Sequence, residues 1–233
     1  MFMKSHLIQK VIFVIFFIVR VQAGSSQGFV NLNFESAQVV PLTTGALFPP
    51  YSIARTNALP GWTVYLGSDQ QSQITYNDPS AGSTWVSLIA TNDSYDSPLS
   101  GQYSVLLQGG LTQSTATISQ TAVVPVSAIS LIFEGLANPS ASLSVSLGGQ
   151  NLNYFMLASS SNYNLYGADI STFAGTSQQL AFSVPNGVQN NWVLDSIQFS
   201  STPIPEPSVL GLSALGGLFL AWRRWRTVKS SRI

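Results

Sequence analysis

Apolar residues recur at every second position through the middle of the chain, from about residue 29 to residue 200. The pattern is clearest at 103–107, 129–133, 143–147 and 180–184, where apolar and polar residues alternate. A period of two is typical of strands that bury one face. Clusters rich in Gly, Pro and Asn separate the runs, and no stretch shows a sustained helical period with caps. The pattern therefore predicts an all-β fold, a β-sandwich of the jelly-roll type.

The expected strands are short, and one domain over residues 24–201 holds all of them. The intervening segments 92–96 and 162–169 are predicted to be polar loops. The strands are expected near 29–34, 62–66, 73–76, 84–90, 102–108, 115–124, 128–134, 142–147, 151–158, 178–184 and 192–200.

The charge and residue types of this domain exclude several classes of function. Between residues 24 and 203, Arg55 is the only basic residue against eight acidic ones, a net charge of −7. Nucleic acid is excluded as a partner, because its binding needs clustered Lys and Arg. The chain has no cysteine, and its one histidine, His6, lies near the N-terminus. Ser-His-Asp and Cys-His catalysis and histidine-ligated metal sites are therefore excluded, and we predict that the protein is not an enzyme.

Residues 1–23 have the features of a secretory signal peptide. Lys4 and Lys10 give a basic start, 11–19 is an unbroken apolar run, and small residues lead to a cleavage site after Ala23. Export through the Sec machinery is expected. The alternative is an uncleaved N-terminal membrane anchor, since Arg20 is an unusual residue so close to a cleavage site.

The C-terminal end predicts a second membrane segment. A Pro-rich linker, 202–208, precedes an apolar run at 209–222, which ends at a basic tail, 223–233. As a helix the run would be about 21 Å long, against a hydrocarbon core of roughly 30 Å. Its C-terminal place, the linker and the arginines still favour a transmembrane helix, with the basic tail in the cytoplasm and the domain outside.

The order of features in this tail resembles the PEP-CTERM sorting signal of Gram-negative bacteria. The residues that carry the resemblance are Pro205, Glu206 and Pro207, then the apolar run with its glycines, then Arg223 and Arg224. The resemblance implies an exported substrate of an exosortase, a membrane enzyme that cuts near the Pro-Glu-Pro. It also implies a place at the cell surface or in an exopolysaccharide matrix. Related tails occur on some proteins described as ice-binding.

A second resemblance extends over the middle domain. Short motifs at 31–35, 59–62, 101–105, 118–121 and 192–197 occur in the same order in galactose-binding-like jelly rolls. Those domains include many carbohydrate-binding modules and many exported domains without a known ligand. The resemblance supports the fold better than any activity.

Asp195 is the most unusual residue of the predicted strands. Its neighbours two positions away, Val193 and Ile197, are apolar, so the alternation predicts that Asp195 points into the core. A buried carboxylate is costly unless it is paired, hydrogen-bonded or bound to a metal ion. The jelly-roll resemblance implies a structural Ca²⁺ between the first and last strands, with Glu35 and Asp195 as ligands. The alternative is a carboxylate satisfied by backbone N–H groups or by Arg55.

A polysaccharide site would need aromatic rings together with amides or carboxylates. The segment with Asn162, Tyr163, Tyr166 and Asp169 has these groups and is the candidate carbohydrate site. Residues 92–96 are a second candidate. The alternative is that both are ordinary polar loops, with tyrosines that cover the ends of the sandwich.

Three functions from different classes remain open. The first is a non-catalytic structural or interaction protein of the cell surface or exopolysaccharide matrix, and it explains the architecture best. The second is an adhesive carbohydrate-binding module, with an ice-binding surface as a less favoured variant because no regular Thr ladder is present. The third, an enzyme, would require a mechanism that uses carboxylates alone.

Overall fold

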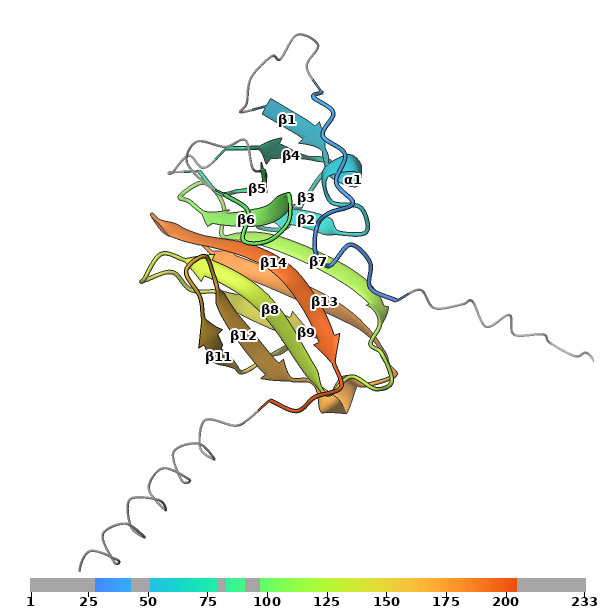
Figure 1. The fold of residues 1–233 in the computed structure, drawn as a ribbon. Coiled ribbons are helices and arrows are strands. Elements are labelled where there is room, and N and C mark those ends of the chain that lie inside the picture. The colour runs from blue at the N-terminus through green and yellow to red at the C-terminus, as the bar shows by residue number, and fades with distance from the viewer. Residues whose placement is uncertain (1–27, 43–50, 79–82, 91–96, 205–233) are drawn as a thin grey trace, which may run out of the picture.

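The computed structural model describes residues 28–42, 51–78, 83–90 and 97–204, which form two β-sheets packed as a sandwich (Figure 1). The predicted all-β sandwich is confirmed. The galactose-binding-like assignment stays a prediction.

The larger sheet has eight strands and the smaller sheet has six. Across the larger sheet the order is β1 (Tyr51–Ala54), β4 (Gln73–Tyr76), β5 (Trp85–Ala90), β6 (Tyr103–Gly109), β14 (Asn190–Ser200), β8 (Ser130–Ala137), β12 (Asn164–Asp169) and β11 (Tyr154–Ser159). Across the smaller sheet the order is β10 (Gln150–Asn151), β9 (Ser144–Leu147), β13 (Ser177–Pro185), β7 (Thr115–Val123), β2 (Thr63–Leu66) and β3 (Asp69–Gln71). The described helices are α1 (Arg55–Ala58) and the 3₁₀ turn η1 (Ser171–Phe173).

The core lies between the two sheets and is built from the alternating apolar residues. Leu131 and Phe133 of β8 face Leu180 and Phe182 of β13, and all four side chains are fully buried. The ring centroids of Phe133 and Phe182 are 5.3 Å apart in an edge-to-face arrangement. Burying a side chain of this size contributes about 1.5–3 kcal/mol, so the core is the main source of stability.

The prediction of a strand at 29–34 is wrong. Asn31 and Phe34 have left-handed backbones, with φ of 49° and 59°, which extended structure does not allow. The segment turns instead, and it places the fully buried Phe34 against Trp62, with 5.8 Å between the ring centroids. The indole N–H of Trp62 donates a hydrogen bond to the carbonyl of Asn31 (3.0 Å), which fixes the turn.

Residues 164–169 form strand β12 rather than the expected loop. Six consecutive residues of β12 pair antiparallel with β8, from Asn164 opposite Gly135 to Asp169 opposite Ser130. The segment lacks a clear alternation, so long-range pairing overrides its local pattern. Strands β1 and β3 were also not predicted. Strand β3 consists of three polar residues and has no apolar alternation, and β1 is a four-residue strand at the edge of the larger sheet.

Strands β4 and β5 separate from each other over part of their length. They pair in parallel, unlike the other named strand pairs of the described residues, and only Thr75 with Ser87 and Tyr76 with Leu88 are in register. The start of β4 is therefore not joined to the start of β5, and this leaves an opening in the larger sheet.

Within the described residues, no helix combines the length and the apolar character needed to cross a membrane. The predicted signal peptide (1–23), its cleavage residue Ala23 and the predicted membrane helix (209–222) lie outside the described residues.

Candidate functional site

A buried polar cluster lies on the outer face of the larger sheet, the face that points away from the smaller sheet. We call it the outer-face cluster, and its members are Ser100, Ser104, Glu134 and Asp195. Asp195 of β14 is in register with Glu134 of β8, and only 1% of Asp195 is exposed. The Ser104 hydroxyl donates to Asp195 Oδ2 (2.6 Å), and the Ser100 hydroxyl donates to Glu134 Oε2 (2.8 Å). The backbone N–H of Ser100 also donates to Asp195 Oδ2 (3.2 Å), so the 97–102 loop is held down over the sheet.

The predicted burial of Asp195 is confirmed, but its predicted direction is wrong. Leu194 lies in the main core, whereas Val193 belongs to a separate apolar cluster on the outer face, and Asp195 lies on the same face as Val193. A β-bulge between Asp195 and Gln198, with Ser196 at φ 46°, then returns Ile197 to the core. The extra residue reverses the alternation, and a period of two counted through the bulge gives the wrong face.

The environment of Asp195 raises its pKa to about 6, chiefly because burial disfavours the charged carboxylate. Hydrogen bonds from Ser104, Ser196 and Ser100 oppose this shift, and the nearby charge of Glu134 adds to it. The protonation of Asp195 is therefore sensitive to pH in the mildly acidic range.

Glu35 holds the same loop from its other side. Its Oε1 accepts hydrogen bonds from the backbone N–H groups of Gln102 (2.8 Å) and Tyr103 (3.0 Å). Gly101 directly precedes these two residues and has φ 61°, and a side chain there would collide with the Glu35 carboxylate. Glu35 and Asp195 therefore both bind the 97–102 loop, although no described hydrogen bond joins their side chains to each other.

These contacts bear on the predicted calcium ligands. Ca²⁺ takes about six to eight oxygen ligands, and the described part of the chain holds no group of three or more His, Cys, Asp or Glu placed to hold a metal ion. N–H and O–H donors already occupy both oxygens of Asp195. Hydrogen bonding therefore accounts for the burial of Asp195, as in the backbone alternative, and calcium stays a prediction. The groups that act on the Asp195 carboxyl are Ser104, Ser196, Ser100 and Glu134, whereas Arg55 donates through Nη1 to the carbonyl of Trp62.

The four predicted carbohydrate residues do not form one site. Tyr166 packs on the core side with Phe133 and Trp192, at 5.4 Å between ring centroids in each case. Tyr163 covers the apolar cluster of the outer face, where the charge of Glu134 raises the pKa of its phenol.

The other two residues of this set lie at opposite ends of β12. Asn162 is exposed in the turn before the strand. Asp169 is exposed at the end of the strand, where its Oδ1 accepts the N–H of Ser171 (2.8 Å) at the start of η1. The second predicted loop, 92–96, lies outside the described residues.

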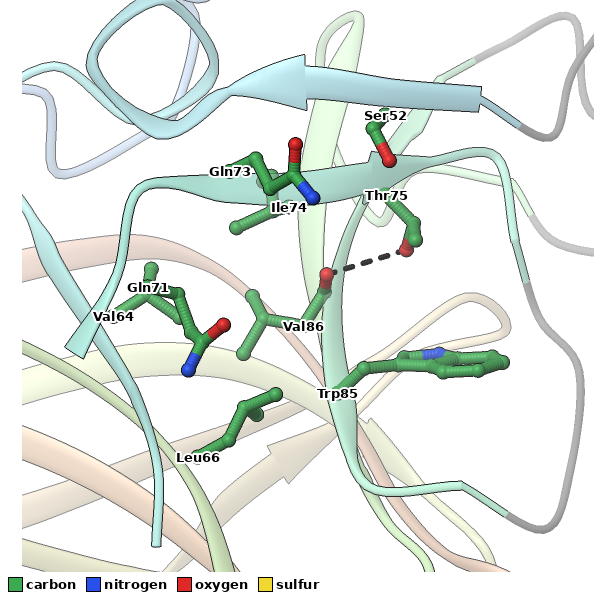
Figure 2. Close-up of a pocket in the computed structure, with 9 residues that line it drawn as sticks. All are labelled: Ser52, Val64, Leu66, Gln71, Gln73, Ile74, Thr75, Trp85 and Val86. Carbon is green, nitrogen blue, oxygen red and sulfur yellow. Dashed lines mark hydrogen bonds between the residues drawn. The ribbon is translucent and has the colours of Figure 1, made fainter. Parts of the chain in front are cut away.

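The structure instead shows a pocket that the sequence did not reveal. We call it the interstrand pocket, because it opens where β4 and β5 separate (Figure 2). Its volume is about 150 Å³. Its lining comes from five strands of both sheets and comprises Ser52, Val64, Leu66, Gln71, Gln73, Ile74, Thr75, Trp85 and Val86.

The pocket has an apolar floor and a neutral polar rim. Val64, Ile74 and Val86 belong to the main core and form the floor with Leu66. The side chains of Ser52, Gln71, Gln73 and Thr75 form the rim (Figure 2). Sequence reasoning missed the site because two of the contributing strands, β1 and β3, were not predicted and no local motif connects the nine residues.

Comparison with known proteins identifies the C-terminal segment. Residues 203–226 match the family model of the PEP-CTERM protein-sorting motif. The match spans Pro205, Glu206 and Pro207 as well as Arg223 and Arg224, so the resemblance seen in the sequence is confirmed. Neither the curated proteins nor the solved structures gave a match to the chain. The motif implies export and membrane-associated sorting, with an exosortase-type enzyme as the partner.

Proposed function

We propose that this chain is an exported protein, sorted through its C-terminal tail, whose sandwich has a non-catalytic structural or interaction role. Its place is the cell surface or exopolysaccharide matrix of a Gram-negative bacterium. The observation that carries the proposal is the PEP-CTERM match at residues 203–226.

The position of the motif relative to the sandwich supports this proposal. The end of β14 is fixed by the Ile129 N–H donating to the Ser200 carbonyl (2.7 Å) and by the Ser130 hydroxyl donating to the Thr202 carbonyl (2.8 Å). Ile204 lies against Gly167, where an added Cβ would come 3.2 Å from Ile204 Cγ2. The described chain is therefore attached to the sandwich up to Ile204, and the sorting tripeptide, Pro205 to Pro207, follows directly in the sequence.

Residue types support a non-catalytic role. The chain has no cysteine, and its single histidine, His6, lies in the predicted signal peptide. The described carboxylate pair, Glu134 and Asp195, is covered by the 97–102 loop and engaged by serine hydroxyls. Such a pair stabilises a loop, whereas a catalytic pair must be open to a substrate.

The sorting proposal is tested by following the protein in cell fractions of its host. Wild-type protein is expected at the surface or in the matrix, whereas Glu206→Ala is expected to stay in the inner-membrane fraction. Asp69→Ala is the control, because Asp69 is an exposed acidic residue on β3, away from the tail. If Glu206→Ala and the wild type distribute alike, the tail is not the sorting signal that we propose.

A carbohydrate-binding module is the second candidate function. The neutral interstrand pocket favours it, since its amides and hydroxyls are groups that bind sugar substituents. No described feature favours an ice-binding surface.

A further inference from the structure

We propose that the interstrand pocket binds the acetamido group of an N-acetylated sugar unit in a polysaccharide. This inference rests on the second candidate function and names its ligand class and its site. It does not depend on whether the sorting tail is removed.

The backbone creates the opening. Because β4 and β5 are in register over only two residue pairs, the starts of the two strands lie apart. Figure 2 shows the side chains of Gln73 and Ile74 on one strand and Val86 on the other, with Leu66 and Gln71 of the smaller sheet beside them. A small group can thus enter through the larger sheet and reach the apolar interior.

The floor suits a methyl group. Leu66 is only partly buried, and Ile74 and Val86 retain 4% and 2% exposure where the surrounding core fixes them. A methyl group placed on them would lose contact with water and gain apolar contacts. A sugar that carries only hydroxyl groups has no substituent of this kind.

The rim suits an amide. Gln71 donates through Nε2 to the Asp69 carbonyl (2.9 Å), which leaves its Oε1 as an acceptor toward the pocket. The Thr75 hydroxyl donates to the Val86 carbonyl (3.3 Å), as the dashed line in Figure 2 shows, and keeps its acceptor capacity. A ligand N–H can therefore be accepted by Gln71 or Thr75.

The carbonyl oxygen of the ligand amide needs a hydrogen-bond donor, and two side chains of the rim can supply one. Within the described residues, the Gln73 carboxamide and the Ser52 hydroxyl make no side-chain hydrogen bond. Either group can donate to a ligand carbonyl. A donor, an acceptor and an apolar floor together match the N–H, the C=O and the methyl group of an acetamido substituent.

The lack of charged side chains in the pocket restricts its ligand to uncharged groups. None of the nine lining residues is charged. A ligand ammonium or carboxylate would lose its hydration without gaining an ionic partner. An N-acetylated amino sugar should therefore bind, whereas its deacetylated, positively charged form should not.

Stacking on Trp85 is not the basis of this proposal. In Figure 2 the Trp85 ring extends away from the other eight side chains. The geometry of the other lining residues supports recognition of a substituent on the sugar rather than of the face of a sugar ring.

The test uses the purified full chain in mild detergent and isothermal titration with an N-acetylglucosamine oligosaccharide. The same oligosaccharide without its acetyl groups and a glucose oligomer of equal length are the comparison ligands. We expect binding of the acetylated ligand and at least 10-fold weaker binding of the other two. Gln73→Ala is expected to weaken binding of the acetylated ligand about 10-fold, the loss of one hydrogen bond to a ligand.

Gln150→Ala is the matched control, because Gln150 is an exposed glutamine on β10, the edge strand of the smaller sheet. Circular dichroism checks that both variants are folded. Failure of the acetylated ligand to bind at millimolar concentration would overturn the proposal. Equal binding of all three ligands, unchanged by Gln73→Ala, would retain carbohydrate binding but reject this pocket. Neither outcome affects the sorting proposal, which is tested by cell fractionation.

Discussion

The two faces of the larger sheet are built from alternate residues of the same strands, yet they are stabilised differently. On the inner face, Leu194 and Phe133 are fully buried in a purely apolar core. On the outer face, their immediate neighbours Asp195 and Glu134 are buried under the 97–102 loop and held by hydrogen bonds.

The two faces of the larger sheet therefore contribute to the stability of the protein in different ways. Apolar packing on the inner face supplies stability that does not depend on protonation. On the outer face, both carboxylates hold the loop through hydrogen bonds, and the buried Asp195 makes this part of the stability depend on pH. Substitutions on the two faces should therefore differ in size and in pH dependence.

The largest expected effect is on the inner face. Phe133→Ala should lower the free energy of unfolding by about 3–5 kcal/mol, because it removes a ring at the centre of the core and leaves a cavity. Chemical denaturation at pH 7 measures the change. Leu136→Ala on the same strand is the control, since Leu136 is 45% exposed and should lose about 1 kcal/mol or less. Equal losses for the two variants would mean that the core is not where we place it.

A smaller loss is expected from the outer-face cluster. Ser104→Ala removes the hydroxyl that donates to Asp195 Oδ2 (2.6 Å) and leaves a buried carboxylate with fewer donors. The expected cost at pH 7 is about 1–3 kcal/mol. Ser177→Ala, at an exposed serine on β13, should change stability by less than about 0.5 kcal/mol. If Ser104→Ala leaves the free energy of unfolding unchanged, the outer-face cluster does not hold the 97–102 loop.

The pH dependence of stability separates the two faces. The pKa of Asp195 is raised from 3.8 to about 6, so between these values the folded protein holds a proton that the unfolded chain releases. Lowering the pH through this window therefore stabilises the fold, by about 1 kcal/mol between pH 7 and pH 5. Asp195→Asn should remove this increment, while Phe133→Ala should keep it. Denaturation of each variant at both pH values tests the difference, and the same slope in Asp195→Asn and in the wild type would rule out this origin.

Calcium removal should have the smallest effect. If hydrogen bonds satisfy Asp195, chelation with EDTA should leave the melting temperature unchanged within about 1 °C. A rise of several degrees on adding millimolar Ca²⁺, lost in both Glu35→Gln and Asp195→Asn, would instead establish the calcium site predicted from the sequence.

The strands of both sheets could be predicted wherever their residues alternate strictly. The expected segments 102–108 and 178–184 correspond to β6 (Tyr103–Gly109) and β13 (Ser177–Pro185). The direction of Asp195 could not be predicted, because it depends on a bulge at Ser196 that has no distinctive residue type. Likewise, β12 forms through pairing with β8, a partner distant in the sequence.

The sorting motif and the interstrand pocket also differ in how far the sequence reveals them. The sorting motif is contiguous, so the residues 203–226 reveal it directly. The interstrand pocket gathers residues of five strands, and its opening depends on the short parallel register of β4 and β5. A site of that kind becomes visible only when the strands are placed in space.

The central claim, sorting through the C-terminal tail, is tested most directly by the intact mass of the protein recovered from its native host. We predict a mass that corresponds to residues 24 to about 205, with both ends removed. A mass that extends through Ile233 would contradict the proposal, because the tail would then be a permanent part of the mature protein.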